Sequence, residues 1–169
     1  MNLGELLADE FGRIREVTHR AVADLTPDQL AFRPDGRGNS IAWLIWHLTR
    51  IQDDHLADVM GTHQVWTSEG WDKRFGLPYP PMDTGYGHSS HEVDECLVES
   101  GELLATYHDA AWRRTSEWVP GLTEADLDRI VDESWDPPVT LGVRLVSVVS
   151  DDLQHAGQAA YVRGLILSR

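Results

Sequence analysis

The 169-residue sequence contains a single cysteine, Cys96, and a single lysine, Lys73. One cysteine cannot form an internal disulfide, which fits a reducing compartment and leads us to expect a cytoplasmic protein. No apolar run approaches the roughly 20 residues that a membrane-spanning helix needs. The N-terminal residues also lack the apolar core of a secretory signal. We therefore expect no membrane partner.

Positive charge is scarce as well, because 14 Lys and Arg stand against 28 Asp and Glu, giving a formal net charge of −14. Such a chain repels the phosphate backbone on which non-specific nucleic-acid binding depends. The charge therefore excludes nucleic acid as a partner class and disfavours an anionic membrane surface. In contrast, tryptophan (seven) and histidine (eight) are abundant. Histidine is the commonest metal ligand and general base, so the histidines are the first candidates for a functional site.

Apolar residues recur with a helical period in four long segments. We predict helices at residues 3–24, 40–60, 92–119 and 140–167. Thr26 followed by Pro27, and Thr123 followed by Asp126, are typical helix starts and predict two additional short helical turns. No segment shows clear strand-type alternation. The length is that of one domain, so we predict a single all-α domain over residues 1–169, built as a four-helix bundle.

A long loop is predicted between the second and third long helices, at residues 62–90, because glycine and proline recur there. Structureless loops of this length are uncommon in compact domains. A disordered segment rarely keeps many large aromatic residues, and this one contains Trp66, Trp71, Phe75, Tyr79 and Tyr86. We therefore expect an ordered loop that acts as a lid and gives a substrate an apolar wall.

Asp151 and His155 lie four residues apart in the last predicted helix, so their side chains project from one face. A carboxylate and an imidazole at this spacing can converge on one metal ion. His47 lies in an apolar and aromatic stretch of the second helix, where an imidazole needs a partner. If these two helices face each other, the three side chains form an open His/Asp/His metal site, the form typical of catalytic sites.

Simpler interpretations exist for the same residues. Asp151 and His155 fit an i,i+4 ion pair on a helix surface, and His47 fits a hydrogen-bonded core histidine. Asp152 lies nearer the centre of the apolar arc than Asp151, so periodicity leaves open which aspartate would bind the metal. The other histidines are most simply surface or loop residues: His19, His55, His63, His88, His91 and His108.

Several further residues are candidates for lining the substrate pocket or for hydrogen-bonding to the metal ligands. They are Trp43, Asp54, His55, Tyr86, His88 and Gln158. A fourth ligand from His55 or His88 would give a closed, structural site instead of an open one. Cys96 has acidic neighbours, which raise a thiol pKa, so we do not expect it to be a nucleophile.

Two stretches together carry a family resemblance. Residues 41–55 run Ile-Ala-Trp-Leu-Ile-Trp-His-Leu and continue to Gln-Asp-Asp-His, and residues 151–158 read Asp-Asp-Leu-Gln-His-Ala-Gly-Gln. In both, the chain resembles the DinB-like superfamily, and more narrowly its actinobacterial DinB/DUF664 type. Residues 74–78, 83–88 and 137–145 resemble the same subgroup, so the resemblance spans essentially the whole chain.

The resemblance implies a four-helix bundle that holds a divalent metal through one histidine of the second helix and two side chains of the last helix. His47 and His155 match two of these ligands. The third position is commonly histidine and is Asp151 here, as in the branch of mycothiol-dependent maleylpyruvate isomerases. Zinc ranks first, but a carboxylate shifts the preference toward harder ions, so nickel, manganese and iron stay open.

The resemblance further implies an S-transferase that joins a low-molecular-weight thiol, such as mycothiol, to a small-molecule electrophile. A metal there would favour the thiolate, which is the nucleophile. Two alternatives stay open: a metal-dependent hydrolase that activates water, and a bundle that binds metal or a small molecule without turnover. No catalytic residue is assigned. The resemblance also allows a homodimer, although the sequence shows no clear interface.

Overall fold

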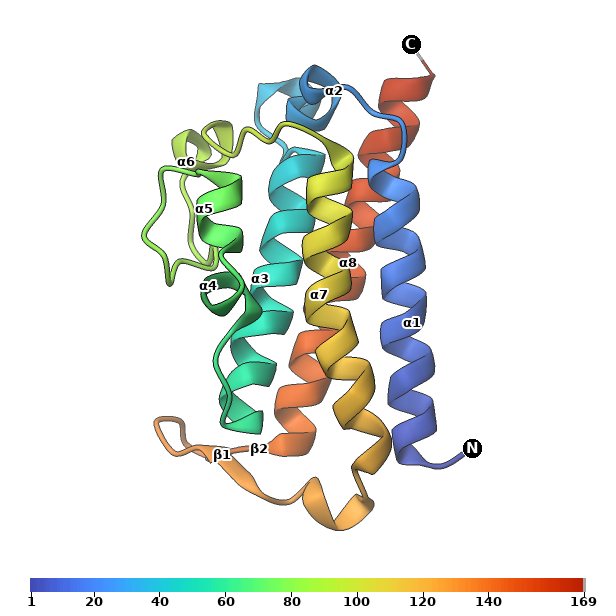
Figure 1. Ribbon diagram of the computed structural model, residues 1–169, viewed down its shortest axis with the longest axis vertical. Helices are drawn as coiled ribbons and strands as arrows, with labels where there is room; N and C mark the ends of the chain where they lie inside the picture. The colour runs from blue at the N-terminus through green and yellow to red at the C-terminus, as the bar shows by residue number, and fades with distance from the viewer. Residues whose placement is uncertain (169) are drawn as a thin grey trace.

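Four long helices lie side by side in the computed structural model, which describes residues 1–168 (Figure 1). They are α1 (Leu3–Val22), α3 (Ile41–Met60), α7 (Gly101–Trp118) and α8 (Leu141–Leu167). Helices α1 and α8 run in one direction, and α3 and α7 run in the opposite direction. The most extensive contact joins α3 to α8, and α1 packs against both α7 and α8. The predicted all-α four-helix bundle is confirmed.

The helices begin where side chains supply partners for free backbone N–H groups. Ser40 accepts such a hydrogen bond at the start of α3, and Thr140 does so at the start of α8. Gly61 ends α3 with a left-handed backbone, φ 66°, a conformation that favours glycine. The helix starts predicted at Thr26 and Thr123 are both formed, each with a capping box, the first at the short helix α2 (Pro27–Ala31).

Helices α3 and α7 run in the same direction, so the end of α3 and the start of α7 lie at opposite ends of the bundle (Figure 1). The connection between them therefore extends along the whole bundle. With 20 residues, α3 is about 30 Å long. The connection contains three short helices, α4 (Val65–Ser68), α5 (Trp71–Phe75) and α6 (Ser90–Asp94). The loop expected at residues 62–90 is therefore ordered, and the direction of the helices explains its length.

The large aromatic side chains of this connection belong to the hydrophobic core. Trp66, Trp71 and Phe75 are 3%, 4% and 7% exposed, and they share one cluster with Trp46 of α3. Tyr86, in contrast, is 88% exposed. The expectation of a lid is therefore wrong for the aromatic part of the loop, because opening it would expose core residues to water.

The third long helix differs from the prediction of one helix over residues 92–119. Two helices, α6 and α7, occupy this range, because Ser100 caps a new helix start by accepting a backbone hydrogen bond from Leu103 at 3.1 Å. Gly101 lies so close to α1 that a Cβ atom would be 2.2 Å from the carbonyl oxygen of Val22. The chain therefore bends before α7 so that its first turn can pack against the end of α1.

A small antiparallel hairpin precedes α8, where no strand was predicted. Its strands are β1 (Ile130–Asp132) and β2 (Val139–Thr140), and Ile130 pairs with Thr140. Strands of two or three residues are too short to show the alternation that identifies a strand in a sequence. The hairpin is joined to α8 by Arg144, which donates a hydrogen bond to Asp132 at 3.1 Å.

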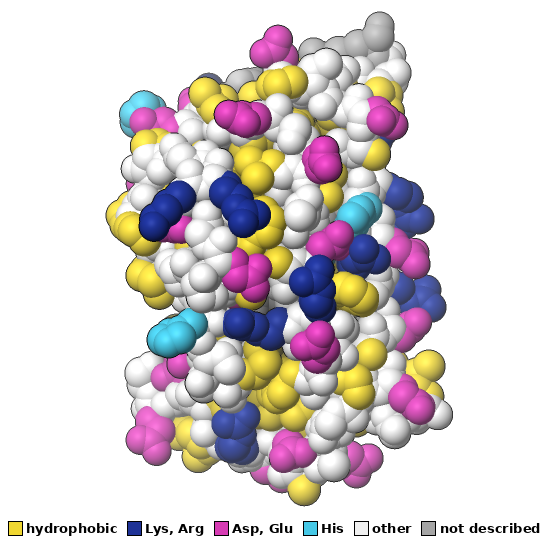
Figure 2. Space-filling model, in the orientation of Figure 1, with side chains coloured by type: hydrophobic (Ala, Val, Ile, Leu, Met, Phe, Trp, Pro, Cys, Tyr) yellow, Lys and Arg dark blue, Asp and Glu magenta, His cyan; other side chains and the backbone are white. Residues whose placement is uncertain are grey.

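Figure 2 shows the face of the bundle on which α7 lies in front, and acidic, basic and apolar side chains are mixed over it. Basic side chains on this face lie next to acidic ones. Among residues 1–168, no helix is both long and apolar enough to cross a membrane.

Cys96 lies between α6 and α7 and is 1% exposed. Burial raises the pKa of its thiol to about 12. A thiol in this state is a poor nucleophile, because the thiolate is the reactive form. The cause is burial in the core, whereas the sequence suggested the acidic neighbours.

The expectation that His108 is a surface or loop residue is wrong, because this residue of α7 has a fully buried side chain. Thr49 uses its hydroxyl proton to donate to the Ile45 carbonyl at 2.7 Å. The 3.1 Å bond between Thr49 and His108 Nδ1 is therefore donated by the histidine. Burial lowers the pKa of His108 from 6.5 to about 3. The folded protein thus holds this histidine in its neutral form.

We expect the His108→Gln variant to lose part of the acid sensitivity of the wild-type protein. An unfolded chain protonates this histidine near pH 6.5, and the folded chain does so only near pH 3. Unfolding therefore takes up a proton in this window, and acidification lowers the free energy of unfolding by up to about 1.4 kcal/mol per pH unit. Urea unfolding of both proteins between about pH 7 and 5 measures the two slopes. Identical slopes would contradict a buried neutral His108.

Candidate metal centre

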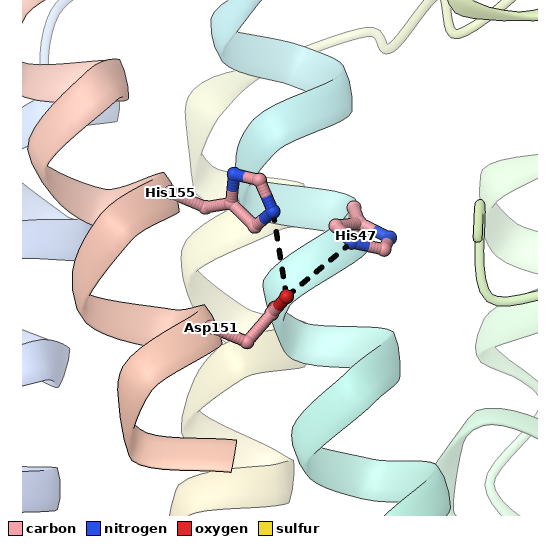
Figure 3. A group of neighbouring side chains, drawn as sticks. All are labelled: His47, Asp151 and His155. Carbon is pink, nitrogen blue, oxygen red and sulfur yellow. Dashed lines mark ion pairs between the residues drawn. The ribbon is translucent and has the colours of Figure 1, made fainter. Parts of the chain in front are cut away.

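His47, Asp151 and His155 meet between α3 and α8 (Figure 3). Asp151 Oδ1 lies 3.5 Å from His155 Nε2 and 3.9 Å from His47 Nε2. One donor atom from each residue lies within 4.8 Å of the other two. Donors around a tetrahedral zinc ion stand roughly 3.4 Å apart. The three atoms are therefore close to the spacing at which they could share one cation.

The two adjacent aspartates of α8 have different surroundings. Asp151 faces α3 and the two histidines, as Figure 3 shows. Asp152 is fully buried in the bundle, and neither of its carboxylate oxygens has a hydrogen-bond partner among the described residues. Burial raises the pKa of Asp152 well above its usual value. The structure thus places Asp151, and not Asp152, with the histidines.

The second ring nitrogen of each histidine, Nδ1, forms a hydrogen bond with a group outside the centre. His47 Nδ1 lies 2.5 Å from the Thr84 carbonyl oxygen, and His155 Nδ1 lies 3.0 Å from Gln158 Oε1. A carbonyl oxygen only accepts, so His47 carries its proton on Nδ1 and leaves a lone pair on Nε2. Metal-binding histidines almost always donate their second N–H in this way. The donor set therefore fits a divalent ion.

Burial lowers the pKa of His47 and so favours its neutral form. Burial also acts to lower the pKa of His155, but hydrogen bonds with Asp151 and Gln158 outweigh it and raise that pKa. The Asp151–His155 contact is the ion pair of the simpler interpretation. An ion pair on α8 does not require His47, however, whose ring is 4% exposed and turns Nε2 toward the same carboxylate.

Trp43 forms one wall of the centre. Its ring stacks on His47, with centroids 4.5 Å apart and planes 12° from parallel, and it meets the ring of His155 edge-on at 6.0 Å. The indole is 6% exposed. It donates a hydrogen bond from Nε1 to His88 Nδ1 at 3.2 Å. Trp43 is therefore a buried side chain that packs against both histidines of the centre.

The two histidines considered as a fourth ligand are occupied elsewhere. His88 Nε2 bonds to Asp83 at 3.1 Å, and Arg144 bonds to Nδ1 of His55. Within the described part of the chain, neither belongs to the group of convergent donors. Two further candidates lie outside that group as well: Asp54 accepts a hydrogen bond from Gln64, and Tyr86 is solvent-exposed.

Sequence reasoning missed the backbone contact at Thr84 and the residues that hold it, Arg50, Asp83 and Gly85. A carbonyl group has no sequence signature, because every residue has one. The available signal was the family-like stretch at residues 83–88, to which the sequence assigned no role beyond candidates Tyr86 and His88.

Two surface hollows lie along α3 and α8 on either side of the centre. One, of about 330 Å³, is lined largely by apolar side chains and includes Leu44, Gln158 and Tyr161. The other, of about 400 Å³, is polar and includes His55 and Arg144. Hollows of this size suit small molecules or parts of them.

Comparisons with known proteins agree on the fold. A family model described as the DinB superfamily matches residues 10–159. The crystal structure of a conserved protein from Enterococcus faecalis superposes with a TM-score of 0.91 at 29% sequence identity, covering 100% of this chain and 99% of that chain. A search of curated proteins finds no match.

Proposed function

Because the chain belongs to the DinB superfamily, we propose that it is a metal-dependent enzyme that transfers a low-molecular-weight thiol, of the mycothiol type, to a small electrophile. The superfamily is generally metal-binding. The observation that carries the proposal is the convergence of His47, Asp151 and His155 through one donor atom each. Zinc is the first candidate ion, and nickel, manganese and iron are the alternatives.

Three ligands leave a coordination position for a substrate, whereas structural zinc sites usually have four protein ligands. A divalent ion held there supplies the charge that stabilises a thiolate near neutral pH. The ligands would be two histidines, neutral once they bind the ion, and one carboxylate, so they would cancel half of the charge of the ion. A net positive centre attracts an anionic sulfur.

The thiol must come from outside the chain, because Cys96 is the single cysteine and is buried. The two hollows beside the centre could take the two substrates. The apolar hollow next to Gln158 suits an electrophile, and the polar hollow next to Arg144 suits the hydrophilic part of a thiol. The indole of Trp43 limits access of water from the side of His47.

The test is conjugate formation between mycothiol and a fluorogenic alkylating probe, monochlorobimane. Protein stripped with a chelator is assayed alone and after addition of zinc, nickel, manganese or iron(II). We expect conjugation to require a metal. In Asp151→Asn the rate of conjugation should fall by more than the roughly 10–100-fold that follows from mutating a residue that only hydrogen-bonds to a metal ligand. Asp128→Asn is the control, because that aspartate is exposed on a distant turn.

Three other results would contradict the proposal. Metal-dependent hydrolysis of esters or amides without conjugation would indicate a hydrolase. Metal binding without either activity would indicate a binding protein. The absence of bound metal would leave Asp151 and His155 as an ion pair.

A further inference from the structure

The segment at residues 83–88 packs directly against the side of His47 that faces away from Asp151. The Thr84 carbonyl accepts the Nδ1 proton of His47 at 2.5 Å. The next residue, Gly85, has φ +86°, and a Cβ atom there would lie 2.9 Å from His47 Nδ1 and 2.9 Å from the ring of Trp46. The backbone of this segment therefore touches the imidazole, and a side chain would displace one or the other.

Asp83 fixes the shape of this segment. Its carboxylate accepts the Gly85 backbone N–H at 2.8 Å and bonds to His88 Nε2 at 3.1 Å. An indole N–H can only donate, so His88 accepts a hydrogen bond from Trp43 at Nδ1 and donates one from its Nε2–H to Asp83. These bonds connect the segment back to α3, the helix that carries His47.

Arg50 connects the same segment to the core. Its side chain is fully buried, and Nε donates to the Asp83 carbonyl at 3.0 Å. The guanidinium lies 3.7 Å from the carboxylate of Asp53 and 5.1 Å from the ring centroid of Trp66. Burying a guanidinium is unfavourable unless its charge and protons are matched. Here the buried group bonds to the peptide next to Thr84.

We propose that Arg50 is a positioning residue for the metal centre. It holds the Asp83 carbonyl, and this places the neighbouring Thr84 carbonyl against His47. That carbonyl keeps the proton of His47 on Nδ1 and directs Nε2 toward Asp151 and His155. The importance of this arrangement for catalysis rests on the proposed function, but the state of His47 can be measured without any metal.

The experiment is a long-range ¹H–¹⁵N correlation spectrum of chelator-treated protein at a pH well above the ordinary pKa of histidine. We expect wild-type His47 to carry its proton on Nδ1. In Arg50→Met the Thr84 carbonyl is released, and we expect a mixture of tautomers. The control is Arg163→Met, since Arg163 also donates to a backbone carbonyl, that of Ala23, but joins α8 to the end of α1. It should keep the wild-type tautomer.

A second variant covers the case in which Arg50→Met fails to fold. Gly85→Ala displaces the segment from His47 by the close approach described above, and we expect the same change of tautomer. Folding of each variant is checked by far-UV circular dichroism. A folded variant in which His47 keeps its proton fully on Nδ1 would overturn the proposal.

Cobalt(II) titration then links the position of His47 to metal binding. We expect Arg50→Met, or Gly85→Ala in its place, to bind cobalt about 10–100-fold more weakly, with altered visible absorption bands. Arg163→Met should match the wild type in both. If Arg50→Met changes the tautomer of His47 as expected but the wild-type protein binds no cobalt, the proposed function fails while the role of Arg50 in placing His47 stands.

Discussion

Replacing His155 with alanine is expected to abolish stable metal binding while the bundle stays folded. The imidazole supplies one of three donor atoms, and its loss leaves too few ligands for a tight site. The affinity for the metal should fall by more than the roughly 10–100-fold that follows from losing a residue that hydrogen-bonds to a metal ligand. His155 is only partly buried, and alanine is the better helix former, so little stability should be lost.

Elemental analysis measures the metal content of the purified variant, prepared without an affinity tag or added metal. Gln154→Ala is the matched control, because this exposed neighbour on α8 hydrogen-bonds to Ser150 of its own helix. The wild type and the control should retain about one ion per chain. Equal metal content in His155→Ala would show that the ligand assignment is wrong.

Replacing Trp66 with alanine should strongly destabilise the protein, although this residue lies outside the four long helices, in the short helix α4. The indole is 3% exposed and packs against Tyr107 at 5.0 Å and Phe75 at 5.2 Å, with the Arg50 guanidinium over its ring. Truncating a buried tryptophan costs about 3–5 kcal/mol. That is a large part of the roughly 5–15 kcal/mol by which a domain is stable.

Denaturant unfolding followed by circular dichroism tests this expectation. Trp135→Ala is the control, since that tryptophan is 66% exposed between the hairpin strands. It should change the free energy of unfolding by no more than about 0.5 kcal/mol. Similar stability of the two variants would mean that the loop is not part of the core.

The sequence identified the four long helices because each has a strong apolar period and most have a recognisable cap. It failed in two places where distant residues decide the local structure. Gly101 begins a new helix because the end of α1 lies against it. Trp66 belongs to the core because α3 and α7 are parallel, which requires the connection to pass along them.

The spacing of Asp151 and His155 suggested that the two share a helix face, and His47 was suggested by its apolar surroundings. Whether the three converge depends on which face of α8 points toward α3, and the structure gives this orientation. Neighbouring helix positions point about 100° apart, so Asp151 reaches α3 while Asp152 points into the bundle. The Thr84 contact could not have been predicted, because it depends on the path of a loop backbone.

The burial of Cys96 has a consequence under the proposed function, in which the protein works among reactive thiols and disulfides. A thiol with a pKa of about 12 and 1% exposure does not enter exchange with disulfides in solution. The intact mass of the folded protein should therefore stay unchanged during incubation with oxidised mycothiol. Under the proposed function, oxidation of the thiol pool would then limit the supply of the thiol substrate without forming a mixed disulfide on the protein itself.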